Sequence, residues 1–274
     1  MDIDQNIVNS LDYARSNWGK VATLGAVLIV PFIIFFAIVF LGALSNNAAI
    51  IITLAIMGTI LLIIAAILVQ GYFYRVIKST LAGLEDLPDF DEWGEMFTSG
   101  LKVLVVQVVY NIIFGIIAII PIMIIFLVFG LVGGFLSIFT GAFTTSATLT
   151  PGAALSSGLL LWGMYLAIFL TYLIMLVVML LYAIVFPLGV ANMAYYDKMS
   201  AAFELSQIRE KIKDIRWGKA VIWVVAIYFV IVVAVLISYI LGLLLVGLIL
   251  VPLIIIPLMI IFYARSTGLL YLNE

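Results

Sequence analysis

The densest group of side chains that could do chemistry lies in residues 84–102, which hold six acids. Asp89 and Asp91 fit part of the spacing of a calcium-binding EF-hand loop. The match fails because Trp93 occupies a ligand position and Gly100 stands where the loop needs a bidentate Glu. We therefore expect no metal site here and interpret the acids as helix-capping residues that also interact favourably with the helix dipole.

The same stretch has the pattern of a short amphipathic helix. Asp89 and Glu92 have the D-x-x-E spacing of an N-terminal capping box. Apolar side chains recur at spacings of three and four on one side, namely Phe90, Trp93, Phe97 and Leu101. We expect this helix to lie on the membrane surface with its acids in water.

Other chemistry is restricted by what the sequence lacks. The chain contains no His and no Cys, which removes thiol chemistry, disulfides and the usual zinc ligands. Residues 21–74, 103–196 and 220–264 contain no Asp, Glu, Lys or Arg. Intramembrane catalysis and proton relays generally need ionisable groups at depth, so we expect neither an enzyme nor a bound cofactor.

Four amide side chains interrupt the apolar runs near their ends, namely Gln70, Gln107, Asn111 and Asn192. Gln107 and Asn111 share one helical face. Such a polar group could line a small cavity, but membrane amides more often form hydrogen bonds between helices. We favour the second interpretation.

Composition identifies the class of protein. Apolar residues make up 67% of the chain and charged residues 9%, and the mean hydropathy is +1.38. These values are typical of a polytopic membrane protein, whose first partner is membrane lipid. No basic stripe exists that could bind nucleic acid. Residues 1–20 lack the features of a signal peptide, and we expect them to form a further amphipathic surface helix.

The 26 charged residues fall into four blocks that separate the apolar runs. An even number of crossings keeps every Lys and Arg on one side, which the positive-inside rule makes cytoplasmic. We expect an all-α protein in the cell membrane with both termini in the cytoplasm. Residues 130–158 are expected to form an external loop or a re-entrant segment. The six expected spans lie near 21–43, 49–72, 103–129, 159–186, 220–241 and 246–264.

A repeated Trp-Gly pair divides this single membrane domain of residues 1–274. Trp18, Trp93 and Trp217 are each followed by Gly and stand before or near a Lys where an apolar run begins. We predict three hairpins in a parallel pseudo-threefold repeat, although Trp gathers at membrane interfaces in any case. The predicted repeat units are 1–83, 84–199 and 200–274.

A family resemblance rests mainly on residues 71–102. The residues that carry it are Gly71-Tyr72, Arg75-Val76, Leu87-Pro88-Asp89-Phe90, Trp93 and Gly100-Leu101-Lys102. This pattern resembles the domain-of-unknown-function 4013 family, multi-span membrane proteins found especially in archaea. The architecture is also similar to the membrane domain attached to some glycerophosphodiester phosphodiesterases. The resemblance implies no catalytic residues.

Two functions remain open. The first, which we favour, is a non-enzymatic membrane component that docks a protein partner through cytoplasmic amphipathic helices. Its expected contact residues are Asp89 and the three Trp residues, together with Arg209 and Lys213 on a third surface helix. The alternative is a transporter or lipid-handling protein for an uncharged or lipidic substrate, which would use the kinked spans.

Overall fold

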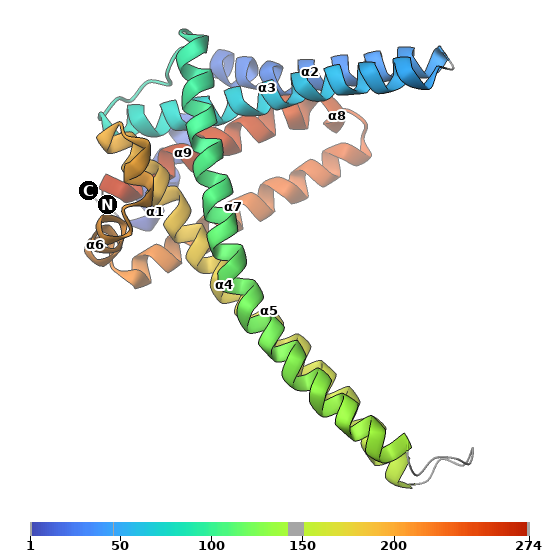
Figure 1. The fold of residues 1–274 in the computed structure, drawn as a ribbon. Coiled ribbons are helices and arrows are strands. Elements are labelled where there is room, and N and C mark those ends of the chain that lie inside the picture. The colour runs from blue at the N-terminus through green and yellow to red at the C-terminus, as the bar shows by residue number, and fades with distance from the viewer. Residues whose placement is uncertain (1, 46, 142–150, 273–274) are drawn as a thin grey trace. The chain divides into compact units, whose positions relative to one another are not determined.

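The computed structural model describes residues 2–45, 47–141 and 151–272, with the side chains of 132–160 left out. All regular structure in these residues is helical (Figure 1). The first half contains α1 (Ile3–Arg15), α2 (Trp18–Leu44), α3 (Ala48–Leu81) and α4 (Trp93–Gly141). The second half contains α5 (Pro151–Tyr196), the 3₁₀-helix η1 (Met199–Phe203), α6 (Leu205–Ile215), α7 (Trp217–Leu243), α8 (Gly247–Leu250), the π-helix η2 (Val251–Ile255) and α9 (Ile256–Leu272).

In the part of the chain that the structure describes, six helices are long and apolar enough to cross a membrane, as the sequence predicted. They run longer than expected: α3 has 34 residues and α4 has 49, whereas a crossing needs about 20. Of the two alternatives for residues 130–158, the external loop is wrong for most of its length, because α4 continues to Gly141 and α5 begins at Pro151. The rest of that expected loop, residues 142–150, lies outside the described residues.

The chain divides into two compact units. The first consists of residues 1–108 and 184–274, and the second of residues 109–183. Every charged residue of the sequence belongs to the first unit. Within that unit, Figure 1 shows both chain ends close to α1 and α6, while the junction of α2 with α3 lies at the opposite end.

The core of the first unit lies near the chain ends. Trp223, Tyr72 and Phe262 are its largest fully buried side chains. Trp223 Nε1 donates a hydrogen bond of 2.8 Å to Ser266 Oγ, so this aromatic core contains a satisfied polar group. Farther along the spans the exposed side chains are large and apolar, as expected of helices whose solvent is lipid.

The crossing of α3 and α4 depends on two glycines. A Cβ added at Gly71 would overlap the carbonyl oxygen of Met96, and one added at Gly100 would overlap the carbonyl oxygen of Ile67. The two backbones therefore touch, which is the packing that small residues permit between membrane helices. This contact fixes the position from which α4 starts.

The second unit is formed by α4 from residue 109 onward and α5 up to residue 183. Phe114 stacks on Tyr110 at 6.2 Å and meets Tyr182 edge-on at 5.5 Å. Ala118 and Ala167 are buried, because small side chains let helices approach closely. The unit contains no charged residue.

Candidate functional site

The acidic stretch forms an extended loop followed by a helix, and this corrects the prediction of a separate surface helix. Residues 82–92 are not helical, and α4 begins at Trp93. Asp89 cannot cap this helix as a D-x-x-E box requires, because Glu92 lies outside it at φ 47°. Of the predicted apolar stripe, Trp93 and Leu101 are exposed, while Met96 outside that stripe is buried.

Side chains from four helices hold this loop through its carbonyl groups. An extended segment has no helical partners for its backbone, so these donors replace the missing hydrogen bonds. The bonds run from Tyr13 Oη to Asp86 O (3.0 Å), Lys20 Nζ to Leu87 O, Tyr72 Oη to Pro88 O (3.1 Å), Arg75 Nη1 to Asp89 O (2.8 Å) and Asp91 O (3.0 Å), and Arg265 Nη1 to Leu84 O (2.8 Å).

Arg265 is the buried cation of this group, with 7% of its surface exposed. Its Nη1 also lies 3.4 Å from Thr80 Oγ1, and its Nε donates to Asn9 Oδ1 at 3.4 Å. The guanidinium stands 4.3 Å from the centre of the Tyr13 ring. None of the described carboxylates forms an ion pair with it. Neutral dipoles and an aromatic face therefore stabilise this buried cation.

Tyr13 and Glu92 both lie outside the six long apolar helices, and both have shifted pKa values. Burial raises the pKa of Tyr13 above its usual 10.0, against the lowering effects of the Ser79 hydroxyl and Arg265. Tyr13 thus stays protonated and can donate to the loop. A hydrogen bond with Glu95 and repulsion from that residue raise the pKa of Glu92, against the lowering effect of Arg75.

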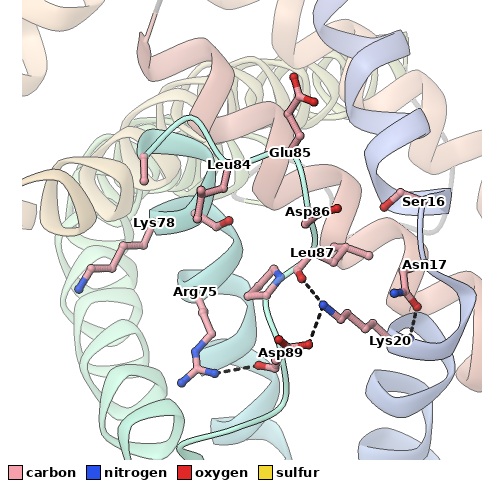
Figure 2. A pocket seen from close by; sticks show the side chains of 13 residues that line it. Ser16, Asn17, Lys20, Arg75, Lys78, Leu84, Glu85, Asp86, Leu87 and Asp89 are labelled. Atoms are coloured by element: carbon pink, nitrogen blue, oxygen red, sulfur yellow. Dashed lines mark hydrogen bonds and ion pairs between the residues drawn. The ribbon is translucent and has the colours of Figure 1, made fainter.

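A pocket of about 760 Å³ lies between this loop and helices α2 and α3 (Figure 2). We call it the loop pocket. Lys20 Nζ is 2.7 Å from an Asp89 carboxylate oxygen, and Arg75 Nη1 is 2.6 Å from one of Asp91. Figure 2 shows Lys20 and Arg75 both directed at the loop around Asp89. Lys20 and Arg75 already bind the loop. Their role here is to position the loop backbone, which leaves little charge available to bind a ligand.

A different pocket, of about 450 Å³, lies among the apolar spans of the first unit. We call it the intramembrane pocket. Side chains of α3, α4, α5, α7, η2 and α9 line it, and its described lining includes no Asp, Glu, Lys or Arg. Gln70 and Gln107 face it from α3 and α4, with Ser238 from α7. Neither glutamine forms a side-chain hydrogen bond with another described residue, so the interhelical bonds that we favoured for the four amides are not seen for this pair.

The π-helix η2 adjoins the same pocket. Ile255 at its end and Ile256 just after it belong to the lining. Pro252 lacks a backbone N–H, and a π-turn widens the helix at this point. A Cβ added at Gly25 would overlap the carbonyl oxygen of Leu253, so α2 packs directly on the widened turn. Single π-turns within helices are frequent at functional sites.

The other two predicted amides lie elsewhere. Asn111 is exposed and does not line the intramembrane pocket. Asn192 is buried and joins three elements at the end of α5. Its Nδ2 donates to Ala201 O at 2.8 Å and Gln207 Oε1 at 3.2 Å, and its Oδ1 accepts from Tyr271 Oη at 2.6 Å. The hydrogen-bonding interpretation is therefore confirmed for Asn192.

No hydrogen bond, ion pair or ring contact joins any two of the predicted docking residues, all of which the structure describes. Trp18, Trp93 and Trp217 are the first residues of α2, α4 and α7 and are 54%, 45% and 46% exposed. Arg209 and Lys213 are exposed on α6. The opposite face of α6 buries Ile208, Ile212 and Ile215, so its apolar side is covered by protein.

Comparison with known proteins gives a family but no activity. A family model described as a protein of unknown function (DUF4013) matches residues 57–243, which is more than half of the chain. The matched region includes Gln70, Gln107 and the loop that the basic residues hold. No curated protein and no solved structure matches the chain.

Proposed function

The chain belongs to the DUF4013 family, and from that premise we propose that it is a membrane protein that binds an uncharged lipidic molecule in the intramembrane pocket. One observation carries the proposal: the glutamines of α3 and α4 face one apolar pocket while neither has a hydrogen-bond partner among the described residues. Both side chains are partly buried, and in apolar surroundings an amide lacks the hydrogen bonds that water would supply. A ligand with hydrogen-bonding groups would supply them.

The lining defines the chemistry of the ligand. Most of it is aliphatic or aromatic, as in Ile231, Met259 and Phe186, and this surface fits hydrocarbon chains. The amides of Gln70 and Gln107 can donate to, and accept from, an ester or a hydroxyl group. A charged headgroup would lack a counter-ion in this lining and would pay a large desolvation penalty. A neutral molecule with one or two oxygen functions, such as a diacylglycerol, meets these conditions.

The size of the pocket agrees with this assignment. Ligand pockets in proteins generally have volumes of about 300–1,000 Å³, and this one has about 450 Å³. Exposed positions on its rim, such as Val235 and Ile256, face what would be lipid. A chain-bearing ligand could therefore enter sideways from the membrane, and the protein could store, present or move it.

Thermal unfolding of the detergent-purified protein tests the proposal. We expect dioleoylglycerol to raise the melting temperature as its mole fraction in the micelle increases, because a ligand that binds only the folded state stabilises it. The shift should disappear in the double variant Gln70→Leu/Gln107→Leu. It should also disappear in Ala234→Phe, which fills the pocket.

The chain offers a matched control on the same helix as Gln107. Asn111→Leu makes the same kind of change one turn along α4 but outside the pocket, so its response to dioleoylglycerol should equal that of the unmodified protein. Equal shifts in all four proteins would mean that the lipid acts on the micelle or on another surface, and the proposal would be rejected.

Docking of a protein partner is a second proposal, supported by the exposed charges of α6. The apolar face of α6 is buried, so a partner that binds α6 would contact its charged face, which includes Arg209 and Lys213. We propose with it that α1 and α6 lie at the cytoplasmic surface of the cell membrane and that the three Trp-Gly pairs reflect a parallel repeat. Loss of a co-purifying partner on reversing both charges would support the docking proposal.

A further inference from the structure

A third pocket, of about 380 Å³, lies where α5 and α9 end beside α6. It is separate in its lining from the loop pocket and the intramembrane pocket. We call it the tyrosine pocket. Six of its lining residues carry the argument, namely Tyr195, Tyr196, Glu210, Lys211, Asp214 and Tyr271.

The three aromatic rings form a connected cluster. The ring centres of Tyr195 and Tyr196 are 5.1 Å apart at an interplanar angle of 81°, and those of Tyr195 and Tyr271 are 5.7 Å apart at 43°. Tyr271 is buried, and the bond from its hydroxyl to Asn192 fixes the ring. Isolated interfacial tyrosines serve as membrane anchors. Rings that converge on a shared pocket offer their electron-rich faces to a ligand.

The pocket already holds a positively charged group. Lys211 Nζ lies 4.7 Å from the centre of the Tyr271 ring, which is a cation–π contact. The two acids come from the same face of α6, because Glu210 and Asp214 are four residues apart. The structure therefore contains aromatic faces, carboxylates and an ammonium group, and the ammonium group belongs to the protein.

We propose that the tyrosine pocket binds an organic ammonium ion, which replaces the Lys211 ammonium group over the ring of Tyr271. Aromatic clusters with nearby acids are the usual means of recognising quaternary ammonium groups. The pocket lies at the ends of two membrane-length helices, where lipid headgroups are found. An ammonium group could arrive there on a zwitterionic phospholipid or as a soluble amine, and Lys211 would then be free to pair with a phosphate.

Binding of tetramethylammonium, measured by saturation-transfer difference NMR on the detergent-purified full chain, tests the proposal. Lys211→Gln should bind this ion more tightly than the unmodified protein, because the internal competitor is gone. Glu210→Gln, a change at an exposed position, should bind it more weakly. Tyr271→Leu should reduce affinity by about two- to thirty-fold through loss of the cation–π contact.

Arg209→Gln is the matched control, because it removes the same charge from the same helix outside the pocket. It should leave the affinity unchanged. Equal gains in affinity for Lys211→Gln and Arg209→Gln would show that only the net charge matters, and this would overturn the proposal. Absence of binding by Lys211→Gln would also overturn it. Tyr271→Phe keeps the ring but loses the hydrogen bond to Asn192. If this variant still binds tetramethylammonium, the aromatic face and not the hydroxyl group is responsible for the affinity.

The source of the ammonium group can be distinguished in nanodiscs. Displacement of Lys211 should increase its rate of acylation by a soluble amine-reactive ester, read by mass spectrometry. A faster rate in phosphatidylcholine than in phosphatidylglycerol discs would identify a lipid headgroup. A rate that rises only when tetramethylammonium is added would identify a soluble amine. An unchanged rate in both tests would contradict the proposed displacement.

Discussion

Arg265 connects its own helix, α9, with three other parts of the first unit. It contacts α1 through Asn9 and Tyr13, α3 through Thr80, and the loop through Leu84. A planar guanidinium can donate in several directions while its face rests on an aromatic ring, and an ammonium group cannot do both. We infer that the shape of Arg265, in addition to its charge, holds the loop.

We predict that Arg265→Lys lowers the melting temperature by about 3–12 °C. The physical reason is the loss of charge-assisted hydrogen bonds, which are worth about 1.5–3 kcal/mol. Circular dichroism of the detergent-purified protein measures the change. Arg209→Lys, at an exposed position on α6, should have no effect. Equal melting temperatures for the two variants would show that charge alone is sufficient at position 265.

At the scale of elements, the α3–α4 crossing determines which side chains meet. Gly71 and Gly100 bring the two backbones into contact, and this contact places Gln70 and Gln107 beside the same pocket. The loop of residues 82–92 then has to span from the end of α3 to the start of α4. The donors that hold it come from the adjacent α3 and from α1, α2 and α9, which are farther away in sequence.

Replacing either crossing glycine by alanine should destabilise the protein. Gly71→Ala and Gly100→Ala each insert a methyl group against a backbone carbonyl, for which we expect about 1–3 kcal/mol of lost stability. Gly94→Ala is the control within α4, because a Cβ there meets nothing within 4 Å and alanine favours helix. Thermal unfolding should place Gly94→Ala at or above the unmodified protein; a loss equal to that of Gly71→Ala would contradict the close crossing.

The six spans could be predicted because each apolar run of about 20 residues must be helical in a membrane. Asn192 was also predicted correctly as a hydrogen-bonding amide. The acidic loop was not predicted correctly. Asp89 and the residues after it have helical spacing, but hydrogen-bond donors from other helices hold their backbone in an extended conformation. A shared cavity for Gln70 and Gln107 was the interpretation that we did not favour, since it depends on how two helices cross and one helical face gives no signal of that.

On the scale of the whole chain, charge is confined to the first unit. Ion pairs join Lys20 with Asp89, Arg75 with Asp91, and Lys78 with Asp197 at 3.3 Å. The start of α2, the end of α3 and the end of α5 therefore meet at one end of this unit. The positive-inside rule predicts that this end is cytoplasmic.

Single cysteines test this orientation cleanly, because the sequence has none of its own. Ser16 and Ser206 are exposed near α1 and α6, and Ser45 is exposed where α2 ends. In intact cells, an impermeant maleimide should label Ser45→Cys and leave Ser16→Cys and Ser206→Cys unlabelled until the membrane is broken. The reverse pattern would invert the predicted topology.

If a neutral lipid occupies the intramembrane pocket, a reactive analogue of that lipid should bind there and label the residues of its lining. Photo-crosslinking in nanodiscs with a diazirine-bearing diacylglycerol, followed by mass spectrometry, locates the contact. We predict crosslinks concentrated in residues 231–238 and 255–260, which decrease in Gln70→Leu/Gln107→Leu and persist in Asn111→Leu. Crosslinks spread evenly over the exposed apolar surface, including residues 112–124 of α4, would contradict specific binding of the lipid in the intramembrane pocket.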